Sequence, residues 1–164
     1  MAARDPVLEL YRRVGRGLYA YARSFVDGGG QAEDLVQEAF LRYLQTGRDA
    51  ADPTASAFLY GIVRNLVLDL VRKSARREKH QPDLARAAAA KSPFQDETLT
   101  ALAFAELQDL PLEQREVVVL KIFGELTFDE IGRLIHAPAA TAASRYRYAL
   151  EKLSARLTAR EEAR

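Results

Sequence analysis

The chain has 164 residues, nearly half of them apolar, a formal net charge of +1 and no cysteine. This length and apolar content suffice for one medium domain or two small ones, and the missing cysteines exclude disulfides, thiol catalysis and thiolate metal sites. The two histidines, His80 and His136, lie far apart in the sequence, which disfavours a histidine-based metal site or acid–base site. No apolar run approaches the roughly 18 residues of a membrane span, so we expect no membrane insertion.

The N-terminal half predicts helices over about 6–26, 32–44 and 57–77. In the first, Leu10, Val14 and Leu18 recur at helical spacing, and the glycines of "DGGG" (27–30) are expected to end it. The second is expected to bury Leu35, Phe40, Leu41 and Leu44. The polar segment 46–56 predicts a loop, and the third helix carries a wide apolar stripe typical of the centre of a bundle.

The C-terminal half begins with "KHQPDLARAAAAKSPFQ" (79–95), which has few large apolar residues and two prolines and therefore indicates a linker. Helices are expected beyond it over about 97–109, 112–123, 127–135 and 138–158. The predicted fold is all-α, with two small helical domains (1–78 and 97–164) joined by a flexible linker (79–96).

The last two helices form a predicted helix-turn-helix. Thr127 and Glu130 make a capping box, with Leu126 and Ile131 placed as its hydrophobic staple. The chain breaks at "HAP", Pro138 starts the second helix, and Gly132 is expected where a partner helix comes close. The expected buried stripe of the second helix is Ala142, Tyr146, Ala149, Leu153 and Leu157.

The other face of that second helix combines small residues, hydroxyls and arginine. Small side chains at its start let a backbone approach a DNA groove, while hydroxyls and arginine bind phosphates and base edges. Basic residues also gather in two blocks, 60–80 and 133–160, separated by acidic stretches, which suggests two nucleic-acid contacts and at least one protein contact. The alternatives are a helix-turn-helix used only for packing, and basic blocks that are solvated helix faces.

Three segments carry a family resemblance: "AEDLVQEAFLRYL" (32–44), "AFLYGIVRNLVLDLVRK" (57–73) and "DLPLEQREVVVLKIFGELTFDEIGRLIHAPAATAASRYRYALEKL" (109–153). In this order they resemble the extracytoplasmic-function (ECF) group of bacterial RNA polymerase sigma factors. The resemblance implies a cytoplasmic protein without enzymatic activity or cofactor, which binds core RNA polymerase and directs promoter-specific transcription initiation. It also implies an anti-sigma factor or another inhibitor as a partner.

The resemblance further implies three sets of site residues. The polymerase-binding set is Asp34, Leu35, Val36, Gln37 and Glu38, of which we expect Leu35 to lie in the core. The set for the minus-ten element, where a base flipped from the opened strand would be captured, is Phe58, Tyr60, Arg64, Asn65, Arg72 and Lys73. The set for the minus-thirty-five element is Ala140, Thr141, Ala143, Ser144, Arg145, Arg147 and Tyr148.

This sequence departs from the family pattern in places. Relatives often carry tryptophan at the start of the third helix, whereas this chain has none and Phe58 takes that region. Glycine usually occupies position 136, so we expect strain at His136. A repressor or activator without sigma activity would explain residues 127–158 but not "EDLVQEAF" or the basic third helix. No nucleophile–base set, phosphate loop or metal-ligand spacing supports an enzyme.

Overall fold

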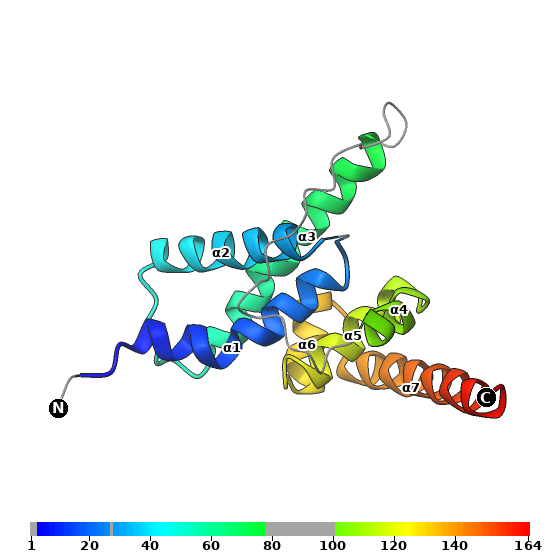
Figure 1. The fold of residues 1–164 in the computed structure, drawn as a ribbon. Coiled ribbons are helices and arrows are strands. Elements are labelled where there is room, and N and C mark those ends of the chain that lie inside the picture. The colour runs from blue at the N-terminus through cyan, green and yellow to red at the C-terminus, as the bar shows by residue number, and fades with distance from the viewer. Residues whose placement is uncertain (1–2, 27, 78–100) are drawn as a thin grey trace. The chain divides into compact units, whose positions relative to one another are not determined.

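The computed structural model describes residues 3–26, 28–77 and 101–164, and the secondary structure of these residues is entirely helical (Figure 1). The all-α fold class is therefore confirmed. The chain divides into two compact units, Met1–Gln95 and Asp96–Arg164. The predicted linker, 79–96, lies outside the described residues, and the exact domain boundaries stay a prediction.

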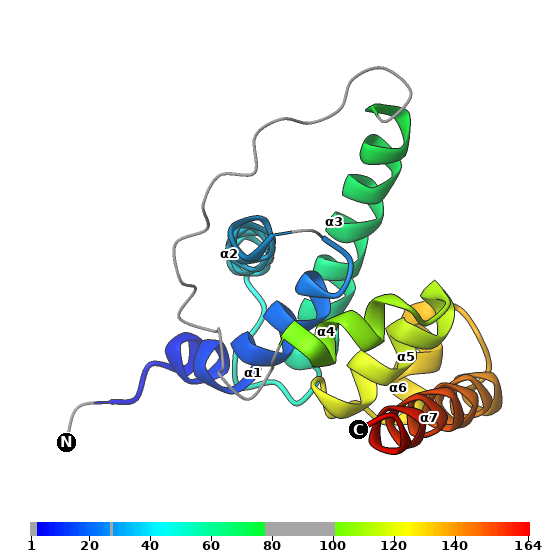
Figure 2. The same cartoon turned by 45° about the vertical axis from the view of Figure 1, so that its right-hand side comes forward.

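The first unit consists of α1 (Pro6–Arg23), α2 (Gly29–Gln45) and α3 (Ala55–Arg77). Each helix packs against the other two, and the C-terminal turns of α3 project beyond α1 and α2 (Figures 1 and 2). Large apolar side chains fill the space between the helices, as expected for a bundle. The largest fully buried ones include Tyr21, Tyr43, Tyr60, Leu10, Leu18 and Leu59.

The glycines between α1 and α2 have a different role from the predicted one. α1 already ends at Arg23, where the buried Ser24 hydroxyl donates to the Ala20 carbonyl at 2.7 Å. Gly29 and Gly30 belong to α2, so the prediction that they end the first helix is wrong. A Cβ atom at Gly29 would lie 2.8 Å from the Tyr19 hydroxyl, and glycine therefore permits a close approach of α2 to α1.

The buried face of α2 also differs from the prediction. Leu41 and Leu44 are 56% and 49% exposed, so their predicted burial is wrong, whereas Phe40 is buried as expected. The fully buried positions are Ala32, Val36, Ala39 and Tyr43. Their spacing of four, three and four is that of one helical face, and it leaves the two leucines on another face.

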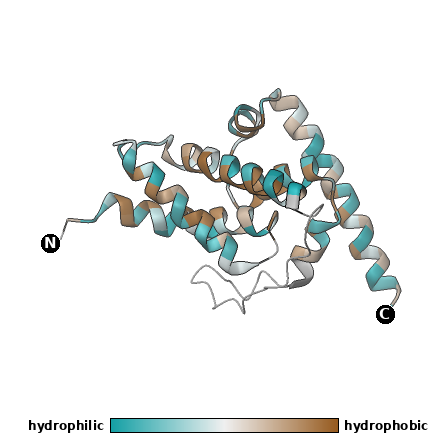
Figure 3. Ribbon diagram, turned by 90° about the horizontal axis from the view of Figure 1, so that it is seen from above, coloured by the Kyte–Doolittle hydropathy of each residue, from teal (hydrophilic) through white to brown (hydrophobic). Residues whose placement is uncertain are grey.

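The second unit consists of α4 (Ala101–Gln108), α5 (Leu112–Ile122), α6 (Phe128–Ile135) and α7 (Ala139–Glu162). α5 and α6 pack against α7 and against each other. Val117, Leu120, Leu126 and Ile131 are buried among them. Figure 3 shows apolar and polar residues alternating along the helices, as expected for helices with one buried face.

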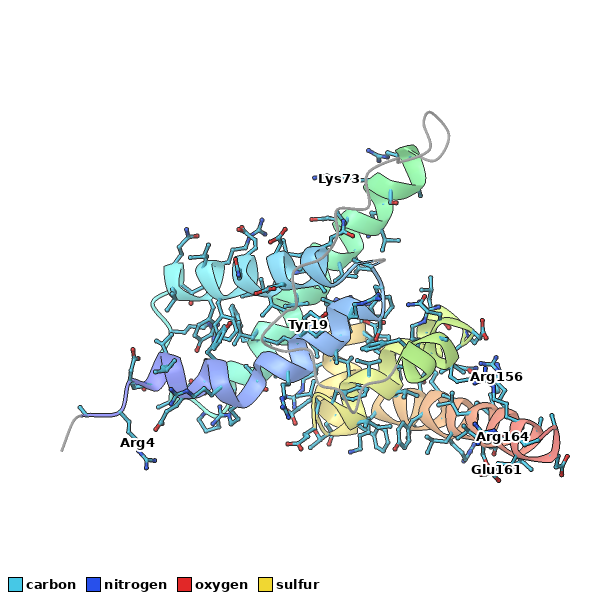
Figure 4. All side chains as sticks on the ribbon, viewed as in Figure 1. Arg4, Tyr19, Lys73, Arg156, Glu161 and Arg164 are labelled. Carbon is cyan, nitrogen blue, oxygen red and sulfur yellow. The ribbon has the colours of Figure 1, made fainter. Side chains whose placement is uncertain are left out.

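Polar contacts join α4 to α7. Glu106 on α4 is buried, and it forms ion pairs with Arg156, at 3.8 Å, and with Arg160. Arg156, labelled in Figure 4, also donates to the carbonyls of Glu106 and Asp109 at 3.2 and 3.1 Å. These contacts fix the C-terminal turns of α7, where Leu157 is 52% exposed and its predicted burial is wrong.

In the described ranges, with 1–2, 27 and 78–100 outside them, no helix combines the length and the apolar character needed to cross a membrane.

Candidate nucleic-acid and polymerase interfaces

The helix-turn-helix begins with the predicted capping box. The Thr127 hydroxyl accepts from the Glu130 amide at 3.1 Å, and the Glu130 carboxylate accepts from the Thr127 amide at 3.1 Å. These two hydrogen bonds satisfy N–H groups that lack partners within the helix. Leu126 and Ile131 are buried, as expected for residues at the staple positions. The capping box and the two helices of the motif are therefore confirmed.

A tight turn joins α6 to α7. His136 has φ 57° and ψ 45°, the left-handed conformation in which we expect strain, and the Ala137 amide donates to the Gly132 carbonyl at 2.9 Å. A Cβ atom at Gly132 would lie 2.6 Å from the Ala137 oxygen. The same Cβ atom would lie 3.2 Å from the amide nitrogen of Ala139, the first residue of α7, so both the turn and the partner helix come close to Gly132.

The start of α7 presents the predicted DNA-reading face. Ala140, Arg147 and Tyr148 are exposed, while Thr141, Ala143, Ser144 and Arg145 are partly exposed. On the opposite side, Ala142 and Ala149 are fully buried, and the Tyr146 ring packs edge-on against Phe128 with centroids 5.6 Å apart. The buried side holds α7 against α6, so the other side is available to a ligand.

The arginines of α7 between positions 145 and 160 divide into two groups. Arg145 forms an ion pair with Glu113 at 3.7 Å, and the Arg147 guanidinium lies 5.3 Å from the Tyr148 ring centroid. Arg156 and Arg160 instead contact Glu106 in the fold of the unit. Only the N-terminal half of α7 therefore combines arginine with the small residues and hydroxyls of a groove-binding face.

The loop between α2 and α3 is held by its own hydrogen bonds. The Thr46 hydroxyl donates to the Tyr43 carbonyl at 2.6 Å, and the Tyr43 hydroxyl donates to the Asp49 carbonyl at 3.1 Å. Asp52 accepts from the amide and the hydroxyl of Thr54, both at 2.7 Å. These bonds from Thr54, with a smaller contribution from Arg48, lower the pKa of the Asp52 carboxyl. These hydrogen bonds give the loop a defined conformation.

The two aromatic residues expected to stack on a base differ in accessibility. Phe58 is partly exposed, and it lies beside the loop with its ring 6.0 Å from that of Tyr43. Tyr60 is only 1% exposed, and its ring packs against Tyr21 at 6.3 Å. A base could reach Tyr60 only by opening the core, so we remove Tyr60 from the minus-ten set and keep Phe58.

The polar members of that set lie along α3. Asn65, Arg72 and Lys73 are exposed and Arg64 is partly exposed, and Figure 4 shows Lys73 near the projecting end of the helix. Arg72 is 3.8 Å from Asp69, and both side chains are largely open to solvent. Exposed ion pairs of this kind are weak, so the pair leaves Arg72 available to phosphate.

The expected polymerase face lies on the solvent side of α2. Asp34 and Gln37 are exposed, and Leu35 and Glu38 are partly exposed, so the expected burial of Leu35 in the core is wrong. Val36 has no exposed surface, which removes it from any contact face. The exposed Leu41 and Leu44 extend the same surface and were missed because they were assigned to the core. The spacing of 34, 37, 41 and 44 places the two leucines on the same side of the helix as Asp34 and Gln37.

In the part of the chain that the structure describes, no group of three or more metal-ligating side chains is present.

Comparisons with known proteins match both units. The model of sigma-70 region 2 matches residues 10–77, and that of sigma-70 region 4 matches residues 104–153. The ECF RNA polymerase sigma factor SigE of Mycolicibacterium smegmatis is 32% identical over 143 residues, which cover 84% of this chain and 56% of SigE. This chain thus spans little more than half the length of SigE. EcfG of Rhodopseudomonas palustris, also an ECF sigma factor, is 35% identical over 144 residues, with 85% and 78% covered.

Solved structures of sigma factors share the fold. The sigma factor RpoE of Bartonella quintana, in complex with the anti-sigma factor NepR, superposes with a TM-score of 0.72 at 22% identity, over 92% of this chain and 95% of RpoE. CnrH, in complex with the cytosolic domain of CnrY, gives a TM-score of 0.65 at 26% identity, over 93% and 88% of the two chains. With both sigma-70 regions matched in order, the chain belongs to the extracytoplasmic-function group of RNA polymerase sigma factors, a family of transcription initiation factors and not of enzymes.

Proposed function

We propose that this chain binds core RNA polymerase and directs it to promoters by contacting both promoter elements. The first unit docks on the polymerase and holds the minus-ten element, and the second unit binds the minus-thirty-five element. The observation that carries this proposal is the helix-turn-helix. One face of its second helix is buried, and the other face, which carries small residues, hydroxyl groups and arginine, is accessible to solvent. This is the arrangement with which such motifs enter the major groove.

The polymerase-binding surface is the exposed face of α2. It combines the acidic and polar side chains of Asp34, Gln37 and Glu38 with the apolar side chains of Leu41 and Leu44. Exposed leucines cost little by themselves, but two of them one turn apart beside carboxylates suit a partner helix with apolar and basic residues. Glu38 also forms an ion pair with Arg42 at 2.9 Å, so Asp34 is the acidic residue with more freedom to pair with the polymerase.

Single-stranded minus-ten DNA binds at Phe58 and along α3. The ring of Phe58 supports a flipped base, and the basic side chains of Arg64, Arg72 and Lys73 hold the backbone. Asn65, which is exposed, supplies a donor and an acceptor for a base edge or a phosphate.

An inhibitory protein partner and a cytoplasmic location belong to the same proposal. The two solved neighbours are complexes, one with the anti-sigma factor NepR and one with the cytosolic domain of CnrY. We infer that a protein of this kind sequesters the chain until transcription is needed. Bacterial polymerase and promoter DNA are cytoplasmic, and the chain acts where they are.

Transcription with purified core polymerase tests the proposal. Promoters are first selected from random-sequence DNA with the assembled holoenzyme, and transcripts are then measured with and without the chain. We expect specific transcripts only when the chain is present. A helix-turn-helix repressor or activator without sigma activity gives none, so their absence would refute the sigma assignment.

Two variants test the residue assignments. Reversal of charge at Asp34 and Glu38 to lysine is expected to abolish core binding and to leave DNA binding by the helix-turn-helix intact, whereas the matched reversal at Glu9 and Asp69 should not affect core binding. Arg147→Ala is expected to weaken promoter binding by about 1–3 kcal/mol if the residue reads a base. Arg164→Ala, with the same loss of charge at the end of the chain, serves as its control.

A further inference from the structure

The accessible ring face of Phe58 is covered by an arginine from the preceding loop. The Arg48 guanidinium carbon lies 4.0 Å from the centroid of the Phe58 ring, at the separation of a cation–π contact. Tyr43, which is buried, meets the same ring edge-on at 6.0 Å. The ring is therefore held from one side by the core and covered by a side chain from the solvent side.

Arg48 itself is exposed, and its guanidinium contacts the Phe58 ring and interacts through its charge with the Asp52 carboxyl. Its backbone is anchored independently, because the Arg48 amide donates to the Thr46 hydroxyl at 3.3 Å. The side chain can consequently swing away from the ring while the loop keeps its conformation. Asp49 and Asp52, the acidic residues of the loop, accept hydrogen bonds from backbone amides at 2.9 and 2.7 Å, which leaves them little freedom to follow Arg48.

We propose that Arg48 is a removable cover on a base-binding site, and that a base of single-stranded DNA displaces its guanidinium from the face of Phe58. This inference rests on the proposed capture of a minus-ten base at Phe58. A flat guanidinium and a flat base compete for the same ring face. Stacking between a base and an aromatic ring is generally the stronger of the two contacts, so the base wins when it is unpaired. A base within a duplex must first leave its stack, and it does not displace Arg48.

The cover has a consequence for affinity. Displacement of the guanidinium costs the same free energy for every captured base, so Arg48 lowers the affinity of the site for single-stranded DNA. Removal of the guanidinium is expected to strengthen the binding of single-stranded DNA about two- to fivefold, the factor that corresponds to an exposed cation–π contact. A residue that only held phosphate would give the opposite sign on removal.

The absence of tryptophan from the sequence makes a direct experiment possible. Phe58→Trp, prepared with 5-fluorotryptophan, places a single fluorine reporter at the site and retains a ring on which arginine can stack. The labelled chain is assembled with unlabelled core polymerase and titrated with short single-stranded dA, dC and dT oligonucleotides. High salt is used so that a lost phosphate contact does not offset the gain from uncovering the ring.

The titration is repeated with Arg48→Ala, and with Arg12→Ala, an exposed arginine on α1, as a control for the lost charge. We expect the half-saturating oligonucleotide concentration to fall about two- to fivefold for Arg48→Ala and to stay constant for Arg12→Ala. If Arg48→Ala leaves the half-saturating concentration unchanged or raises it, the proposal that Arg48 covers the ring is refuted, whereas base capture at position 58 is not. A fluorine signal that no oligonucleotide shifts would overturn both, while the transcription assay judges the sigma function separately.

Discussion

Loss of the Arg115 side chain on α5 is expected to destabilise the second unit strongly. Arg115 is 8% exposed, and its guanidinium donates to the carbonyls of Leu107, Gln108 and Leu110 at 2.8, 2.7 and 3.1 Å. The Leu107 and Gln108 oxygens lie at the C-terminal end of α4, where carbonyls have no partner within the helix, and the Leu110 oxygen lies in the turn that follows. Burial lowers the pKa of Arg115, whereas Asp109 opposes this shift, so the guanidinium is desolvated yet remains the capping group of α4.

The magnitude follows from the bonds that are lost. A hydrogen bond from a charged donor contributes about 1.5–3 kcal/mol, and the bonds to Leu107 and Leu110 are buried, so Arg115→Ala is expected to cost about 3 kcal/mol or more. The other bonds are partly open to water, which replaces them in the variant. For a domain of this size, 3 kcal/mol corresponds to a decrease of about 12–24 °C in its melting temperature.

Arg115→Lys separates the geometry of the guanidinium from its charge. A single ammonium group cannot reach the carbonyls of both Leu107 and Leu110 in the way that the planar guanidinium does. Lysine is therefore expected to recover only a minor part of the stability. Arg133→Ala removes the same charge from an exposed position on α6 and serves as the control.

Hydrogen exchange of the full chain is the appropriate assay, because it reports each helix separately. Faster exchange is expected in α4 to α7 of Arg115→Ala, with α1 to α3 unchanged as an internal reference. A loss within about 0.5 kcal/mol, the range typical of surface substitutions, would refute the capping role.

Three further substitutions test the helix-turn-helix, each by thermal unfolding and promoter-DNA binding. Thr127→Ala removes the side-chain cap of α6 and is expected to cost about 1 kcal/mol. Gly132→Ala places a Cβ atom 2.6 Å from the Ala137 oxygen, and it should cost about 1–3 kcal/mol and weaken DNA binding as the turn shifts. His136→Gly relieves a left-handed backbone at φ 57° and should stabilise the unit by about 1 kcal/mol with DNA binding unchanged. Equal stability of His136→Gly and the parent would exclude strain at that turn.

The sequence predicted the helices and the helix-turn-helix because their determinants are local. The capping box at Thr127 and Glu130 and the break before Pro138 involve residues only a few positions apart, and both are present in the structure. Gly29 was misread because the group that demands a small residue there, the Tyr19 hydroxyl, comes from the other helix. Turn chemistry is visible in the sequence, whereas a close approach between two helices is not.

Burial on α2 could not be predicted from periodicity alone, because this helix has two apolar faces. One contains Val36 and Tyr43 and packs in the core, and the other contains Leu41 and Leu44 and is exposed. Either face satisfies the spacing of an amphipathic helix, and only packing against α1 and α3 decides between them. A second apolar face on a helix of a small domain is therefore better read as a partner surface than as additional core.

The aromatic residues of α3 did carry a signal in the sequence. Phe58 and Tyr60 are two positions apart, and at 3.6 residues per turn such side chains point to nearly opposite sides of a helix. Both could not have faced the same strand of DNA, so one of them had to be buried. The apolar stripe of this helix includes Phe58 itself, so the sequence did not indicate which one, and the structure buries Tyr60 beside Leu59 and Val63.

The basic block of α7 illustrates what a count of charges misses. Glu106, about 50 positions before Arg156, is buried on α4 and requires positive partners, which Arg156 and Arg160 provide. A buried carboxylate without partners would be strongly unfavourable, so these two arginines are committed to the fold whether or not DNA is present. Among the residues that the structure describes, Arg145 pairs with an exposed glutamate, Glu113, and such an ion pair can be exchanged for phosphate or a base at little cost. The division of α7 into a structural half and a DNA-reading half therefore follows from which of its arginines pair with the buried Glu106 carboxylate.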